Sequence, residues 1–169
     1  GSCTYFGTAA SLYDKVAVVG VVGTDFPQEH IAFLQGRQID LRGLQIVEGK
    51  TFRWSGCYGQ DLDVAKTLET QLNVFAGFRP TIPQDLRQTP YVFLANIDPD
   101  LQLAVLDQVG SPRFVALDSM NYWITSKRDR LVEAMALVDL VLVNEDEARM
   151  FTGESNLITA AEAILALGP

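Results

Sequence analysis

The chain has 169 residues, 48% of them hydrophobic, and a mean hydropathy of +0.12, which suffices for one compact domain with a buried core. Its net charge of −8 disfavours a nucleic-acid partner, although a small anion could still bind at a helix N-terminus. No apolar run approaches the roughly 18 residues that span a bilayer, and residues 1–13 lack a signal-peptide pattern. We therefore expect a cytoplasmic protein in which Cys3 and Cys57 are reduced thiols.

Strand and helix patterns alternate along most of the chain. The β-branched run 15–23 predicts a strand, and Pro27 then lies where the helical pattern of residues 28–37 can begin. Further strands are predicted at 91–97, 113–118 and 139–144, and further helices at 100–109, 126–137, 145–151 and 156–167. Continuous apolar strands separated by amphipathic helices predict an α/β fold, with a mostly parallel sheet flanked by helices.

The segment 45–78 departs from this alternation. Residues 51–58 alternate with period 2, which places Phe52, Trp54 and Tyr58 on one face and Arg53 on the other. Residues 71–78 form a second strand-like run. The pattern predicts an antiparallel pair that projects from an α/β core made of residues 1–44 and 79–169.

Within that segment, Gly49-Lys50-Thr51 matches the end of a phosphate-binding loop. Such a loop reads G-x-x-x-x-G-K-[ST], follows a buried strand and leads directly into a helix. Here five residues, rather than four, separate Gly43 from Gly49, and the residues after Thr51 predict a strand. Without a helix N-terminus, the N–H groups that hold the anion are missing, so we expect no phosphate binding here.

Polar residues follow three of the predicted strands. Asn96 and Asp118 end two of them, with Asp98 close behind, and Asn144 ends a third. Ligands of open α/β sheets bind at the carboxyl ends of the strands, so these residues predict a polar cleft. Asn144 and Glu147 have the spacing of a helix-capping box, and the acidic cluster 145–147 could instead serve a hydrated Mg²⁺. The sequence leaves both interpretations open.

Several motifs, in this order, resemble the PfkB/ribokinase family of carbohydrate kinases. Residues 1–27 are similar to the family's first signature, which has a glycine turn, an Ala-rich helix and V-G-x-V-G-x-D; the last part matches Val19, Gly20, Val22, Gly23 and Asp25. "GRQIDLRGL" (36–44) is similar to the G-I-D segment that leads into the family's lid, and "VNEDEARMFTG" matches N-x-x-E at Asn144 and Glu147. The resemblance implies a ribokinase-like fold with residues 45–78 as a β lid.

The resemblance also implies an activity. Members transfer the γ-phosphoryl group of ATP to a hydroxyl of a sugar or a nucleoside, so we expect a sugar kinase, with a nucleoside kinase or a non-catalytic sugar- or nucleotide-binding module as alternatives. It implies that ATP and Mg²⁺ are held by Asn144, Glu147 and Asp118, with Glu147 nearest the metal. It further implies a homodimer through the lid and a substrate contacted by Gly1, Thr4, Arg53 and Asn96.

The sequence also departs from the family pattern. The family's first strand and the G-A-G-D that carries the catalytic base have no counterpart in these 169 residues. Tyr5 stands where many members carry a sugar-contacting Asn. We therefore expect no catalytic residue in this chain, a chain truncated at both ends, and no phosphoryl transfer by the chain alone.

Overall fold

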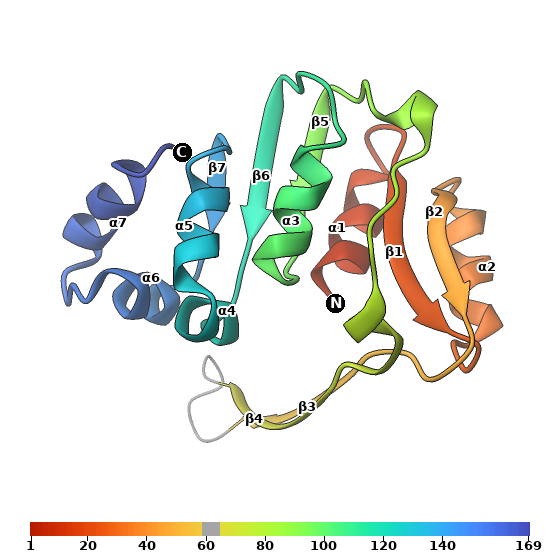
Figure 1. Cartoon of the computed structure of the whole chain (residues 1–169), viewed down its shortest axis with the longest axis horizontal. Helices are drawn as coiled ribbons and strands as arrows, with labels where there is room; N and C mark the ends of the chain where they lie inside the picture. The colour runs from red at the N-terminus through yellow and green to blue at the C-terminus, as the bar shows by residue number, and fades with distance from the viewer. Residues whose placement is uncertain (59–64) are drawn as a thin grey trace. The chain divides into compact units, whose positions relative to one another are not determined.

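The computed structural model describes residues 1–58 and 65–169 and divides the chain into two compact units (Figure 1). The first unit comprises Gly1–Phe6 and Thr81–Pro169, and the second comprises Gly7–Pro80. Both units combine parallel strands with helices, so the predicted α/β class is confirmed. The described helices are all too short or too polar to cross a membrane. The predicted lid boundaries at residues 45 and 78 stay a prediction.

The sheet of the first unit has three parallel strands in the order β5-β6-β7. They are β5 (Tyr91–Leu94), β6 (Phe114–Asp118) and β7 (Leu140–Leu142). In the central strand, Leu117 is fully buried and pairs with Leu94 on one side and with Val141 on the other. Burial on both faces explains the continuous apolar run of β6, whereas Leu140 and Leu142 of β7 are exposed.

A helix follows the carboxyl end of each strand in this unit. The helices are α3 (Pro99–Leu106), α4 (Asn121–Ser126), α5 (Arg128–Met135), α6 (Glu145–Thr152) and α7 (Leu157–Leu165). The turn after β5 has a common helix-start sequence: Asp98 accepts a hydrogen bond from the N–H of Asp100 (3.0 Å), and Pro99 opens α3. One apolar core joins the sheet and the helices, and its fully buried members are Leu117, Leu131, Ala134, Met135 and Ala160.

The second unit contains a parallel pair, β1 (Ala17–Gly23) and β2 (Asp40–Val47), with α2 (Gln28–Gly36) between them. Helix α1 (Ser2–Ala10) begins in the first unit and ends in the second. Strand β2 was not predicted, because Asp40 and Arg42 interrupt its apolar pattern. These two side chains satisfy each other through a salt bridge of 2.6 Å, so a strand at this position leaves no unpaired charge.

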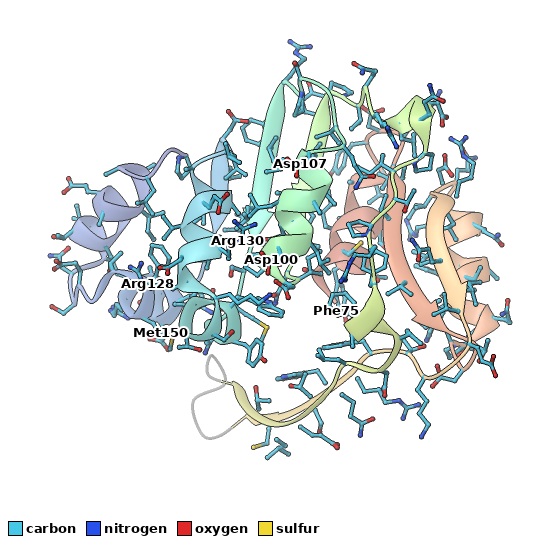
Figure 2. The ribbon with its side chains drawn as sticks, viewed as in Figure 1. Phe75, Asp100, Asp107, Arg128, Arg130 and Met150 are labelled. Atoms are coloured by element: carbon cyan, nitrogen blue, oxygen red, sulfur yellow. The ribbon has the colours of Figure 1, made fainter. Side chains whose placement is uncertain are left out.

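An antiparallel pair, β3 (Arg53–Tyr58) and β4 (Ala65–Gln71), projects from β1 and β2 in Figure 1. The prediction of a strand at 71–78 is wrong, because Asn73–Gly77 form a 3₁₀ helix, η1. Asn73 has a φ of 50° and its side chain donates to the carbonyl of Thr51 (2.9 Å), which turns the chain back toward the start of β3. Phe75 of η1, labelled in Figure 2, packs edge-on against Phe52. The side chain of Tyr58 is not described, so the face predicted for it stays a prediction.

Candidate functional site

The carboxyl ends of β5 and β6 are joined by hydrogen bonds around Asn96 and Asp118. The backbone N–H of Asn96 donates to Ser2 Oγ over 3.0 Å. The hydroxyl of Ser2 and the backbone N–H groups of Asn96 and Ser119 also donate hydrogen bonds to the Asp118 carboxylate. Burial raises the pKa of Asp118 above its ordinary value, while these hydrogen bonds oppose the rise. Asp118 is therefore a half-buried carboxylate at the end of the central strand.

Asn96 is oriented by a neighbouring tryptophan. Trp123 of α4 is buried, and its indole Nε1 donates to Asn96 Oδ1 over 3.1 Å. An indole can only donate, so the carboxamide oxygen of Asn96 faces Trp123. The NH₂ group of Asn96 is then the side of the carboxamide that can donate to a ligand.

Gln102 of α3 ties the same two strand ends together. It is fully buried, and its Nε2 donates to the carbonyl oxygens of Ala95 and Asp118, each over 3.0 Å. Gln102 Oε1 and Ser119 Oγ are buried and have no hydrogen-bond partner among the described residues. Our sequence analysis missed Gln102; the available signal was a polar residue within the otherwise apolar helix 101–106.

Asn144 and Glu147 form the capping box that was one of the two interpretations of their spacing. The N–H of Glu147 donates to Asn144 Oδ1, and the N–H of Asn144 donates to Glu147 Oε2, both over 2.9 Å. Glu147 is only 8% exposed, whereas Asn144 is exposed. Because the cap engages Oε2 alone, it is compatible with a ligand at the other carboxylate oxygen.

The negative charge of Asp118, at the end of β6, acts on Glu147, which follows β7. Burial raises the pKa of Glu147, the hydrogen bond from the N–H of Asn144 opposes this rise, and the negative charge of Asp118 adds to it. In the described part of the chain, no three His, Cys, Asp or Glu side chains are grouped to hold a metal by themselves. Two carboxylates fit Mg²⁺, which is usually bound by one or two carboxylates together with water and substrate phosphates.

Asp98 is the other acidic residue of the predicted polar cleft, and hydrogen bonds within the protein occupy its carboxylate. It caps α3 and accepts hydrogen bonds from Lys127 Nζ over 2.7 and 2.8 Å. Lys127 and Arg130 also bind Asp100, over 2.5 and 2.6 Å, and Figure 2 shows Asp100 on α3 near Arg130 on α5. This ion-pair network joins α3 to α5.

The remaining residues predicted to bind substrate are distributed over both units. Gly1 and Thr4 lie exposed at the start of α1, where the carbonyl of Gly1 accepts from the N–H of Thr4 (3.1 Å). The adjacent Ser2 brings this end of the chain to Asn96 and Asp118. Arg53 belongs to the second unit, where its exposed guanidinium lies 3.4 Å from Asp25.

Parallel strands whose polar carboxyl ends precede helices define an α/β protein, and matches to solved structures show that its fold is ribokinase-like. A candidate ribokinase II from E. coli, solved with ATP and Mg²⁺, matches 99% of the chain with a TM-score of 0.74 at 15% identity; the match covers 59% of that protein. Halothermothrix orenii fructokinase matches 99% of the chain with a TM-score of 0.74 at 17% identity, over 65% of its own length. At these identities, the matches establish the fold alone.

Sequence comparison identifies the family. Residues 7–169 match the pfkB family carbohydrate kinase domain. The cytidine kinase of Thermococcus kodakarensis is 30% identical in an alignment of length 167, and the match covers 97% of this chain and 59% of that protein. The chain therefore belongs to the pfkB family, as its motifs indicated, and it spans about three fifths of the length of this relative.

Proposed function

We propose that the protein transfers the γ-phosphoryl group of ATP to a hydroxyl group of a sugar or a nucleoside. The observation that carries the proposal is the pair of carboxylates at neighbouring strand ends of a pfkB-family chain, the half-buried Asp118 and the buried Glu147. Two like charges raise the pKa of a buried carboxyl group unless a cation compensates them. This arrangement supports a site for Mg²⁺ and the nucleotide phosphates.

Each residue has a distinct role in this proposal. Glu147 would hold Mg²⁺, Asp118 would add the second negative charge, and Asn144 fixes the side chain of Glu147 through the capping box. Bound Mg²⁺ would neutralise the negative charge of the phosphate groups. Asn96 would donate its NH₂ group to the acceptor, and the family resemblance adds Gly1, Thr4 and Arg53 as further acceptor contacts.

Of the two candidate acceptors, a sugar and a nucleoside, one observation favours the nucleoside. The cytidine kinase relative is twice as identical to this chain as the ribokinase II structure, at 30% against 15%. A panel of sugars and nucleosides, assayed with the full gene product, separates the two candidates. Phosphorylation of sugars alone would refute the nucleoside acceptor.

The decisive test separates the charge of Glu147 from its role in the helix cap. In the variant Glu147→Gln, the side-chain oxygen can still accept the N–H of Asn144, because glutamine also completes a capping box. We expect Mg²⁺-dependent ATP binding by the full gene product to weaken about tenfold or more, with an unchanged melting temperature. Isothermal titration calorimetry measures the first quantity and thermal unfolding the second.

The matched control is Glu145→Gln. Glu145 lies in the same first turn of α6, but its exposed side chain pairs with Arg149. We expect this variant to bind MgATP like the wild type. Equal weakening in both variants would show that the helix needs only general negative charge, and unaltered binding in Glu147→Gln would remove the proposed metal role.

We also propose a homodimer through the β3–β4 pair. Trp54 on β3 is 39% exposed and Leu68 on β4 is 62% exposed, so the pair carries apolar surface that a second copy would cover. The variant Leu68→Glu should shift the protein to a monomer in sedimentation velocity. The control Ile158→Glu, at an exposed position of α7, should remain dimeric, and a dimeric Leu68→Glu protein would contradict the proposal.

A further inference from the structure

Two motifs that the proposed function leaves without a role meet in the second unit. Asp25 is the acidic residue of V-G-x-V-G-x-D, and Thr51 ends the Gly-Lys-Thr that resembles a phosphate-binding loop. The N–H and the hydroxyl of Thr51 both donate to Asp25 Oδ1, over 2.7 and 2.6 Å. The N–H of Gly23 donates to Thr51 Oγ1 over 3.0 Å. These bonds tie the carboxyl end of β1 to the residues that precede β3.

Glycines let the two backbones approach closely at this contact. A Cβ atom on Gly23 would lie 2.2 Å from the carbonyl oxygen of Gly49 and 2.6 Å from the nitrogen of Thr51. Gly49 itself has a φ of +127°, a conformation that side chains rarely adopt. Its carbonyl also accepts the N–H of Thr24 over 3.1 Å. The Gly-Lys-Thr segment therefore packs against the carboxyl end of β1 in this structure.

Lys50 and Thr51, which precede β3, also bond to the residues that follow β4. The side chain of Asn73, just after β4, donates to the carbonyl of Thr51 (2.9 Å), and the N–H of Val74 donates to the carbonyl of Lys50 (3.1 Å). The chain thus enters β3 and leaves β4 at one point, which is bonded to Asp25. The base of the β3–β4 pair is fixed by this contact.

Asp25 reaches one further residue. Its second carboxylate oxygen, Oδ2, lies 3.4 Å from the guanidinium of Arg53, the first residue of β3. The hydrogen bonds from the side chain and backbone of Thr51, and then the interaction with Arg53, hold the pKa of Asp25 below its ordinary value. The carboxylate therefore stays charged at neutral pH and restricts the direction of an otherwise exposed arginine.

We propose that Asp25 and Thr51 are positioning residues for acceptor binding: they fix the base of the β3–β4 pair and orient Arg53. We call Gly23, Asp25 and Thr51 the β1 latch. The inference rests on the proposed function, because it takes the β3–β4 pair as the part of the kinase that closes over the acceptor. None of the three residues of the latch needs to touch the acceptor or the nucleotide.

Three variants of the full gene product test the β1 latch. Thr51→Val keeps the shape of the side chain and removes the hydroxyl, Thr51→Ser restores the hydroxyl, and Asp25→Asn keeps an oxygen for Thr51 but removes the charge that faces Arg53. The matched control is Asp40→Asn, since Asp40 is another aspartate with a lowered pKa, and Arg42, with which it forms a salt bridge, lies on the same strand.

We expect Thr51→Val and Asp25→Asn to raise the acceptor KM about tenfold, with kcat within about twofold and an unchanged Kd for MgATP. Thr51→Ser should recover most of the wild-type KM, and Asp40→Asn should match the wild type. Amide hydrogen exchange gives a readout independent of catalysis. The backbone amide of residue 51 should exchange faster in Thr51→Val than in the wild type and regain its protection in Thr51→Ser.

The outcomes distinguish a failure of the proposed role of the latch from a failure of the proposed kinase function. An active wild type whose latch variants keep the acceptor KM overturns the inference alone. Parallel losses in acceptor and MgATP affinity also overturn it, since they indicate general destabilisation. A wild type that phosphorylates no sugar or nucleoside removes the proposed function and, with it, the role of the latch in acceptor binding, whatever the exchange of Thr51 shows.

Discussion

Replacing Gly23 by alanine tests how closely β1 and the Gly-Lys-Thr segment approach each other. The added Cβ would meet three backbone atoms at 2.2–2.6 Å, those of Gly49, Lys50 and Thr51. Backbone cannot move aside like the end of a flexible side chain, so the two segments must separate. Separation would also stretch the 3.0 Å hydrogen bond from the Gly23 N–H to Thr51 Oγ1.

The expected cost combines both effects. Overpacking costs about 1–3 kcal/mol, and loss of one hydrogen bond adds about 1 kcal/mol, so Gly23→Ala should destabilise the protein by about 2–4 kcal/mol. Gly20 is the matched control on the same strand. Its Cβ would lie 3.8 Å from a methyl group of Leu44, an ordinary contact, so Gly20→Ala should be neutral or stabilise by up to about 1 kcal/mol.

Urea unfolding measures both variants, and the chain's two tryptophans give each unit its own signal. Trp54 lies in the second unit and Trp123 in the first, so 5-fluorotryptophan labelling and ¹⁹F NMR follow them separately. We expect the Trp54 transition of Gly23→Ala to move to lower urea by about 1–2 M for an m-value of about 2 kcal/mol/M. A Gly23→Ala protein as stable as Gly20→Ala would refute the reasoning.

Two further predictions concern the first unit. Gln102→Met keeps the volume of the side chain but leaves the carbonyls of Ala95 and Asp118 without their donor, so it should cost about 2–4 kcal/mol in urea unfolding; a cost below about 0.5 kcal/mol would contradict the proposed link between the strand ends. Hydrogen bonds from Lys127 and Arg130 lower the pKa of Asp100, so its contribution to stability is present above the ordinary aspartate pKa and is lost as the pH falls through the folded-state pKa. The difference in unfolding free energy between wild type and Asp100→Asn should therefore shrink below about pH 4, and a difference that is constant from pH 3 to 7 would contradict this assignment.

Local signals in the sequence predicted the elements that depend on neighbouring residues. The strands β1, β5 and β6 were predicted from continuous apolar runs, because a strand buried on both faces needs apolar residues at successive positions. The capping box of Asn144 and Glu147 was one of the two interpretations of their spacing, and it was accessible from the sequence because a cap involves only residues two or three apart. The motif spacing also indicated the pfkB family, which the comparison with known proteins confirmed.

Predictions failed where contacts distant in sequence decide the conformation. Residues 71–78 have a strand-like composition, but Asn73 and Val74 bond to residues 22 and 24 positions earlier, which favours a 3₁₀ turn over an extended strand. Strand β2 has a mixed composition and forms because it pairs with β1. No local pattern distinguishes such segments, since their partners lie elsewhere in the chain.

The sequence by itself predicted the α/β class from alternating apolar strands and amphipathic helices, and the order of its motifs resembled the pfkB family, to which the chain belongs. It also predicted that a strand, and not the helix of a phosphate-binding loop, follows Gly49-Lys50-Thr51, and β3 confirms this strand. Only the tertiary structure decided what that segment does: Thr51 lies against Gly23 and is bonded to Asp25, 26 positions earlier. The tertiary structure likewise brought Gln102 to the ends of β5 and β6 and the charge of Asp118 to Glu147. The physical reason is that hydrogen bonds and charge interactions depend on distance in space, which chain folding sets and residue spacing alone does not.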